Sequence, residues 1–119
     1  MKKVLIVDDS QAQAALTKSV LETAGYLAVA LTDPMRIEQI IDVERPHLIL
    51  LDVVMPQRNG FQACRELKKH AHYRHIPVVL VTSKDQASDK FWGEQQGADG
   101  YVVKPFTAQQ LLGMVQKFF

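Results

Sequence analysis

The sequence predicts an α/β fold in which five parallel strands alternate with five helices around one sheet. Short runs of β-branched and aliphatic residues alternate along the chain with longer segments of helical period, which is the pattern of successive βα units. The short runs are almost wholly apolar, as expected for parallel strands that are buried on both faces. The expected strands are residues 4–7, 26–31, 47–51, 77–81 and 100–103.

The first two expected helices have suitable residues at their ends. Ser10 can cap the N-terminus of the first helix, and Gly25 can end it. The apolar face of this helix is expected to hold Leu16, Val20 and Ala24. Asp33 can cap the second helix, with Pro34 at the first helical position. Its apolar residues are Ile37, Ile40 and Ile41.

Three further helices are expected in the second half of the chain. The third begins after Asn59, and the fourth covers about residues 88–96 and ends at Gly97. The fourth is the least amphipathic of the five. The fifth follows Thr107. The apolar positions are Phe61, Cys64 and Leu67 in the third helix, and Leu111, Leu112 and Val115 in the fifth.

The length and composition favour one domain over residues 1–119, with no output domain. A chain of 119 residues has the usual size of a single domain. Its formal net charge of +1 offers no basic field for DNA. No apolar stretch is long enough for membrane insertion, and the single cysteine, Cys64, suits a reducing compartment. We therefore expect a cytoplasmic protein that binds no DNA.

Polar residues follow four of the five expected strands. Asp8 and Asp9 follow the first strand, Asp52 the third, Thr82 the fourth and Lys104 the fifth. Each residue alone has an ordinary explanation as a cap, turn or loop residue. Parallel strands, however, deliver the residues that follow them to one edge of the sheet, where ligands of such folds bind. Three carboxylates at one edge would repel one another unless a cation lay between them.

This set of residues suits magnesium and phosphoryl chemistry. Oxygen ligands select a hard cation such as Mg²⁺, which binds through one or two carboxylates and keeps several waters. A carboxylate held there, such as Asp52, can attack phosphorus and form an aspartyl phosphate. Lys104, the Thr82 hydroxyl and the Ser83 backbone N–H could then neutralise the phosphoryl oxygens.

Four segments together have a highly specific spacing. They are DD at residues 8–9, DVVMPQRNG at 52–60, TS at 82–83 and GYVVKPF at 100–106. On these segments, and over essentially its whole length, the chain resembles a CheY-like receiver domain of the response-regulator family. The resemblance implies a flavodoxin-like, doubly wound (βα)5 fold with strand order 2-1-3-4-5.

The resemblance also implies a function for particular residues. Asp52 is expected to accept a phosphoryl group from a histidine kinase. Mg²⁺ is expected to bind to Asp9, Asp52 and the backbone carbonyl of Val54, with Asp8 supporting it through water. Because Val54 carries no polar group at a position where many relatives do, the lifetime of the phosphoryl group is left open.

A switch and a surface for a downstream target protein follow from the same resemblance. Thr82 and Tyr101 are expected to form the switch, and the Lys104–Pro105 bond is expected to be cis. From the residues alone, Tyr101 could equally be a half-buried strand aromatic. The fourth helix, the fifth strand and the fifth helix would form the binding surface. Trp92 there is either a partner anchor or a partly buried aromatic residue.

Two segments point to a subgroup of the family. Residues 59–71 and 83–101 resemble the stand-alone, PilH-like receivers of the twitching-motility, type IV pilus chemotaxis-like systems. We therefore expect a single-domain response regulator of a two-component pathway. It is expected to be a signalling phosphoacceptor rather than an enzyme, apart from self-catalysed phosphoryl transfer and dephosphorylation.

Other functions remain open at this stage. The chain could drain phosphate from a sister regulator, or it could be an interaction module that needs no phosphate. A Mg²⁺-dependent phosphohydrolase is disfavoured because Val54 stands where a second aspartate would be needed. A flavin-binding module is disfavoured by the three acids. His70, His72 and His75 are close in sequence, but solvated side chains at a helix end are a better explanation than a metal site.

Overall fold

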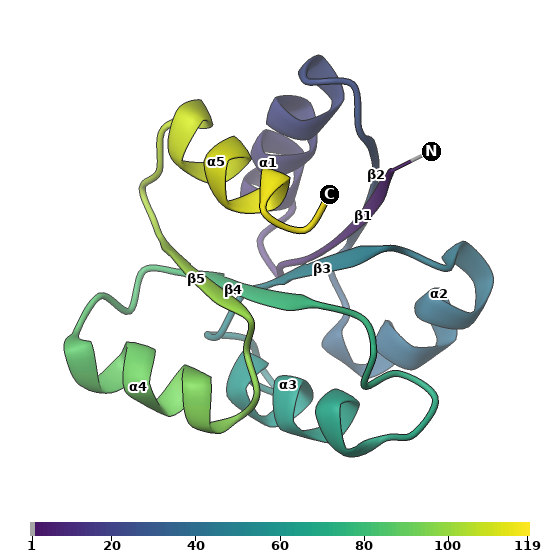
Figure 1. Ribbon diagram of the computed structural model, residues 1–119, viewed down its shortest axis with the longest axis vertical. Helices are drawn as coiled ribbons and strands as arrows, with labels where there is room; N and C mark the ends of the chain where they lie inside the picture. Colours follow the sequence, from purple (N-terminus) through teal and green to yellow (C-terminus); the bar gives the residue numbers. More distant parts are fainter. Residues whose placement is uncertain (1) are drawn as a thin grey trace.

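The computed structural model describes residues 2–119 and contains one sheet of five parallel strands in the order β2-β1-β3-β4-β5 (Figure 1). This confirms the predicted fold class and strand order. The strands are β1 (Lys3–Val7), β2 (Leu27–Leu31), β3 (Leu48–Leu51), β4 (Val78–Thr82) and β5 (Gly100–Val103). The helices are α1 (Gln11–Thr23), a short 3-10 helix (Pro34–Arg36), α2 (Ile37–Glu44), α3 (Gly60–Lys69), α4 (Ala87–Gln95) and α5 (Ala108–Gln116).

The helices cover both faces of the sheet. Helices α1 and α5 lie on one face, and α2, α3 and α4 lie on the other (Figure 1). Because successive strand residues point to opposite faces, each strand contributes to two cores. In β3, Leu48 and Leu50 belong to the core beneath α1 and α5, whereas Ile49 and Leu51 belong to the other core. All four are fully buried, which explains why the strand is wholly apolar.

The inward face of α1 differs from the prediction. Ala14, Thr17 and Leu21 are buried, whereas Leu16 is 54% exposed and Ala24 is also exposed. The buried face of α1 passes through Thr17, a residue with a polar side chain. Its hydroxyl donates to the Gln13 carbonyl oxygen at 3.1 Å, which satisfies the hydroxyl within the helix and allows the side chain to be buried.

The start of the second helix also differs from the prediction. Asp33 does cap the segment, since its carboxylate accepts from the Met35 backbone N–H at 3.0 Å. The residues that follow, from Pro34, form a 3-10 turn, and α2 begins only at Ile37. Ile37 and Ile41 are buried as expected, and Ile40 is partly buried.

The remaining helices end close to the expected residues. The side chains of Ser10, Asn59 and Thr107 cap α1, α3 and α5, respectively. Gly97 follows α4 with a φ of 94°, in the region where only glycine is unstrained. Cys64 is buried, and burial raises the pKa of its thiol to about 11. Cys64 is therefore a residue of the hydrophobic core.

Strand β4 is one residue longer at its carboxyl end than predicted. It includes Thr82, which pairs with Val103 of β5. The Thr82 carbonyl oxygen accepts from the Lys104 backbone N–H at 2.9 Å, so the strand pairing fixes the backbone of both residues. The Lys104–Pro105 bond is cis. None of the helices within residues 2–119 has the length and hydropathy to cross a membrane.

Candidate functional site

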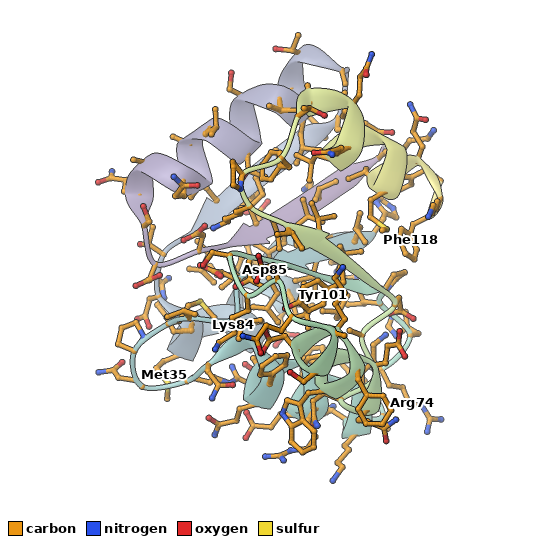
Figure 2. The ribbon with its side chains drawn as sticks, turned by 90° about the vertical axis from the view of Figure 1, so that its left-hand side faces the viewer. Met35, Arg74, Lys84, Asp85, Tyr101 and Phe118 are labelled. Carbon is orange, nitrogen blue, oxygen red and sulfur yellow. The ribbon has the colours of Figure 1, made fainter. Side chains whose placement is uncertain are left out.

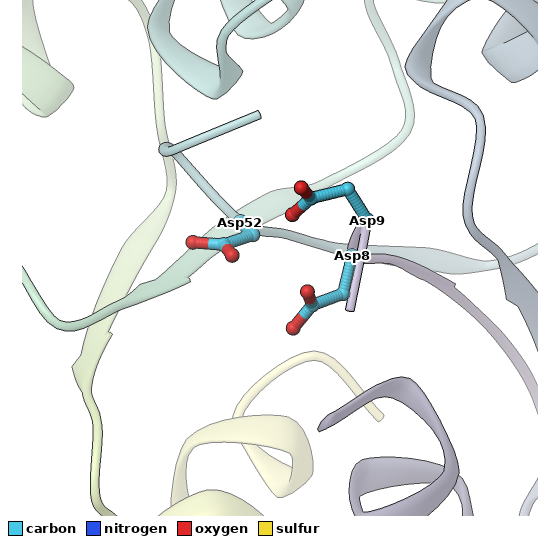
Figure 3. Close-up of side chains that lie close together, drawn as sticks. All are labelled: Asp8, Asp9 and Asp52. Carbon is cyan, nitrogen blue, oxygen red and sulfur yellow. The ribbon is translucent and has the colours of Figure 1, made fainter. Parts of the chain in front are cut away.

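The carboxyl ends of β1 and β3 bring the predicted acids together. Val7 pairs with Leu51, and the Asp52 backbone N–H donates to the Val7 carbonyl oxygen at 2.9 Å. Asp8 and Asp52, which follow the two strands, therefore lie at the same edge of the sheet next to each other. Asp8, Asp9 and Asp52 each place an oxygen within 4.8 Å of the others (Figure 3). Within residues 2–119, this is the one group of three or more potential metal ligands.

Lys104 lies against two of the three acids. Its Nζ atom is 2.6 Å from Oδ2 of Asp8 and 3.4 Å from Oδ2 of Asp52. All three side chains are largely buried, with exposed fractions of 14% for Lys104, 5% for Asp8 and 12% for Asp52. A buried carboxylate needs a charge partner. Lys104 supplies one cation for two acids, while Asp9 is exposed.

Asp52 is left with unfavourable electrostatics. Burial raises the pKa of its carboxyl, and the neighbouring Asp8 adds to that rise. Lys104 and the hydrogen bond from the Val53 backbone N–H, at 2.7 Å, oppose the rise without cancelling it. The negative charge of ionised Asp52 is therefore only partly balanced by its surroundings. A further cation at this edge would relieve it.

The donor set fits Mg²⁺. The three side chains offer only carboxylate oxygens, which are the ligands that hard cations prefer. The exposed Asp9 would leave room for bound waters. Val54 lies in the loop that follows Asp52, with its side chain exposed. The participation of its backbone carbonyl in a metal site stays a prediction.

Thr82 and Tyr101 both contact the backbone of Lys84. The Thr82 side chain is fully buried, and its hydroxyl accepts from the Lys84 backbone N–H at 3.4 Å. The Tyr101 hydroxyl donates to the Lys84 carbonyl oxygen at 2.7 Å. Figure 2 shows Lys84 and Asp85 in the loop beside Tyr101. Burial, together with nearby acids, raises the pKa of Tyr101 to about 12, so the hydroxyl remains a donor.

Two further predicted residues, Ser83 and Trp92, do not join the acids. Ser83 and Lys84 are exposed in the loop after β4. Trp92 of α4 is 49% exposed, and its neighbour Phe91 is exposed as well. About half of the Trp92 side chain is therefore covered and half is free, and its role as a partner anchor stays a prediction.

Arg58 anchors the loop that follows Asp52, a role that no sequence pattern indicated. The Arg58 guanidinium donates two hydrogen bonds to Glu38, at 2.8 and 2.7 Å, and one to Glu66 at 2.9 Å. It also donates to the Pro34 carbonyl oxygen at 3.0 Å. Its side chain is only 8% exposed. Arg58 therefore turns away from Asp52 and ties the loop to α2 and α3.

Gly60 is a second residue whose role the sequence did not reveal. A Cβ atom at this position would run into the backbone carbonyl of Asp52. The Gly60 backbone N–H also donates to the Val53 carbonyl oxygen at 2.8 Å. The start of α3 is thus packed directly against the backbone of the predicted acceptor, which only glycine permits.

The histidines at the end of α3 are not gathered into a group of potential metal ligands within residues 2–119. The rings of His70 and His72 lie 6.4 Å apart, and both pack against Tyr73. The Nδ1 atom of His70 accepts from the His72 backbone N–H at 3.1 Å. Local packing explains these two side chains.

Comparison with known proteins assigns the family. Residues 4–116 match the response regulator receiver domain. The chain belongs to this family. A receiver is a signalling regulator rather than a classical enzyme, and phosphorylation on an aspartate with a change of binding partner is typical of the family.

Individual relatives support the CheY-like assignment. The receiver is 41% identical to protein PilH of Pseudomonas aeruginosa, over 94% of this chain and 93% of PilH. It is similar in structure to the chemotaxis protein CheY4 of Vibrio cholerae, with a TM-score of 0.92 and 30% identity over 100% of this chain and 99% of CheY4. The receiver domain of a histidine kinase from Syntrophus aciditrophicus has a TM-score of 0.90 and 33% identity, over 99% and 89% of the two chains. These findings confirm the expected resemblance, including that to PilH.

Proposed function

We infer that this receiver accepts a phosphoryl group on Asp52 from a histidine kinase and then changes its affinity for a target protein. The proposal rests mainly on one observation, the meeting of Asp8, Asp9, Asp52 and Lys104 at the carboxyl edge of the sheet. The likeness to PilH agrees with the resemblance of residues 59–71 and 83–101 to receivers of the type IV pilus chemotaxis-like systems, and we propose that the receiver acts in such a pathway, in the cytoplasm.

Asp52 is the proposed nucleophile. Its carboxylate oxygen attacks the phosphorus of a phosphohistidine, the P–N bond breaks, and the imidazole keeps the electron pair and takes up a proton. Asp9, Asp52 and the Val54 carbonyl are the proposed ligands of Mg²⁺, which Asp8 would support through water. When bound, the ion would supply positive charge for the phosphoryl oxygens.

The chain's own donors would stabilise the remaining charge. Lys104 already lies 3.4 Å from Asp52, so a small movement of its flexible side chain would bring Nζ to a phosphoryl oxygen. The Thr82 hydroxyl and the Ser83 backbone N–H are the proposed donors for another oxygen. The same groups would take part in self-catalysed dephosphorylation, in which water attacks the phosphorus.

Lys84 links the site to the proposed switch. A phosphoryl group adds roughly −1.5 to −2 charges and three strong acceptors. It would draw the Thr82 hydroxyl away from the Lys84 N–H, a contact that is already long at 3.4 Å. A change in the Lys84 backbone would reach Tyr101 through its 2.7 Å hydrogen bond. The face formed by α4, β5 and α5 is the proposed surface for the target protein.

Intact-mass analysis tests the acceptor. Wild type and Asp52→Asn are incubated with acetyl phosphate, with and without Mg²⁺. We expect a hydroxylamine-labile phosphoryl adduct only on wild type and only with Mg²⁺. The Asp85→Asn variant, which removes an exposed acid of the β4–α4 loop, is the matched control and should be phosphorylated normally. Equal adducts on wild type and Asp52→Asn would refute the proposal.

A further inference from the structure

A pocket lies at the end of the molecule opposite the acids. It has a volume of about 730 Å³ and is lined by residues within 41–47, from the end of α2 and the turn before β3, and within 71–76, between α3 and β4. Both segments precede strands, whereas Asp8 and Asp52 follow strands. Figure 2 shows Arg74, from the second segment, at one end of the molecule and Met35, which follows β2, at the other. The pocket is therefore separate from the phosphorylation site.

The floor of the pocket is apolar. Ile41, Pro46 and Ile76 are buried residues of its lining. The Tyr73 ring is also buried, and its hydroxyl donates to Asp42 at 2.9 Å. Asp42 is the one acid in the lining, and it accepts this hydrogen bond through one of its two carboxylate oxygens. The floor can therefore accept an apolar or aromatic side chain, as pockets in interface centres do.

The rim of the pocket carries hydrogen-bond donors and positive charge. Arg45, His47, His72 and His75 line it. The His47 Nδ1 atom accepts from the Lys3 backbone N–H at 3.1 Å, so the neutral ring carries its proton on Nε2, which remains a donor. Arg45 takes part in none of the ion pairs found in residues 2–119.

The surroundings of the pocket add to its positive charge. Lys69 and Arg74 are exposed and, like Arg45, belong to none of the ion pairs of the described chain. The nearby lysines are already neutralised, because Lys3 pairs with Glu44 at 3.3 Å and Lys68 pairs with Asp99 at 2.8 Å. This end therefore has an excess of cations in a chain whose net charge is only +1.

We propose that this pocket is a docking site for an acidic polypeptide segment that inserts an aromatic side chain. The apolar floor accounts for the aromatic anchor, and Arg45 at the rim, with Lys69 and Arg74 nearby, accounts for acidic flanking residues by charge complementarity. A concave site with three separate imidazoles suits a side chain better than a membrane surface or a nucleic-acid backbone, which require an extended basic surface. The site would let the receiver bind a second protein while the α4–β5–α5 face stays free.

Arg45 offers a variant that should not damage the fold. Its φ and ψ are 49° and 59°, in the left-handed region, where asparagine is better tolerated than arginine. Arg45→Asn therefore removes the charge and keeps the chain folded. Arg65→Gln removes an exposed arginine of α3 that does not line the pocket, and it is the matched control.

The test uses the peptide Gly-Glu-Glu-Phe-Glu-Glu-Gly as a probe, with amide chemical shifts of the full chain as the readout. We expect shifts within residues 41–47 and 71–76, and binding several-fold weaker to Arg45→Asn but unchanged for Arg65→Gln. Replacing the glutamates of the probe by glutamine, or its phenylalanine by alanine, should also weaken binding.

Several outcomes would overturn the proposal. They are the absence of shifts in these two segments at millimolar probe, equal binding by the glutamine or alanine probes, and equal binding to Arg45→Asn. Stronger perturbation of the same residues by vesicles of anionic phospholipid or by single-stranded DNA would also reject a polypeptide occupant. The result does not depend on phosphorylation, so it is separable from the proposed function.

Discussion

The Nζ atom of Lys104 lies 2.6 Å from Oδ2 of Asp8, which joins the ends of β5 and β1 across 96 residues. The same Nζ lies 3.4 Å from Oδ2 of Asp52. Lys104 is thus the cation that allows two acids to be buried together. Lys104 compensates only part of the negative charge of these acids. This edge of the sheet is therefore suited to bind a metal ion and a phosphoryl group.

Removing the positive charge of Lys104 should lower the stability of the protein. Lys104→Met keeps much of the side-chain volume but leaves Asp8 and Asp52 without their cation. We expect a loss of about 2 kcal/mol in the free energy of unfolding at pH 7, below the value for a fully buried pair because the site is partly open. Urea unfolding measures it, and millimolar Mg²⁺ should restore part of the loss. Lys90→Met, at an exposed position, is the control, and an equal effect of both variants would contradict this role of Lys104.

Removing the charge of Asp52 should have the opposite effect. Because the folded-state pKa of Asp52 is raised, ionisation of this group opposes folding. Asp52→Asn should therefore be more stable than wild type at pH 7 by about 1 kcal/mol, as is common where function requires poorly compensated charge.

The pH dependence of this difference follows from the sign of the shift. Protonation relieves the penalty, so the advantage of Asp52→Asn should shrink as the pH falls through the raised pKa towards the ordinary aspartate value. Thermal unfolding at several pH values from neutral to about 4 measures this. A variant less stable than wild type at pH 7, or a difference that grows on acidification, would contradict the electrostatic account.

The Arg58 network should contribute to stability in a different pH range. Burial is the largest single influence on Glu38 and would raise its pKa, but the hydrogen bonds from Arg58, a backbone hydrogen bond and the charge of Arg58 together outweigh burial and lower the pKa. The contribution is therefore present above the unfolded-state pKa of Glu38 and is lost as the pH falls through the lowered folded-state value. Arg58→Ala should cost about 2 kcal/mol at pH 7, discounted because both glutamates are partly exposed.

Chemical denaturation at neutral and acidic pH checks the Arg58 prediction. The difference between wild type and Arg58→Ala should narrow below about pH 4, where glutamates become protonated. Arg65→Ala, on the exposed face of α3, should change stability by less than about 0.5 kcal/mol. A difference for Arg58→Ala that is independent of pH would show that packing alone stabilises the loop.

Two glycines should respond to alanine in opposite directions. Gly60→Ala would push a methyl group into the Asp52 backbone, so we expect a loss of stability and of phosphorylation rate. Gly113 lies within α5 with open space at its Cβ position, so Gly113→Ala should gain about 0.5–1 kcal/mol. Thermal unfolding of both variants measures this. Equal shifts would mean that the contact between α3 and the Asp52 backbone is unimportant.

The meeting of the acids at the sheet edge could be predicted from local sequence, whereas the contacts of Arg58 could not. Asp8, Asp52 and Lys104 each follow an apolar strand directly, and parallel strands bring such residues together by geometry. The partners of Arg58 lie 20 residues before it, at Glu38, and 8 residues after it, at Glu66. No local pattern connects charges at those separations, so only the packing of α2 against the loop reveals them.

The burial of α1 could not be predicted from hydrophobicity alone. The pattern selected Leu16, but the buried face passes through Thr17, whose hydroxyl is satisfied by a carbonyl of the preceding turn. The pocket lined by residues within 41–47 and 71–76 also could not be predicted from the sequence. The sequence pattern indicates only a solvated helix end for His72 and His75, and the apolar floor includes Ile41, which comes from a different helix, α2.

The most direct test of the account is to locate the phosphoryl group itself. The receiver is phosphorylated in the presence of Mg²⁺, the acyl phosphate is reduced with borohydride to leave homoserine in place of the modified aspartate, and the site is mapped by tandem mass spectrometry. The account predicts homoserine at Asp52 alone, with Asp8 and Asp9 unmodified and no product when Mg²⁺ is removed by chelation. Homoserine at Asp8 or Asp9, or labelling of Asp52 that does not require Mg²⁺, would contradict it.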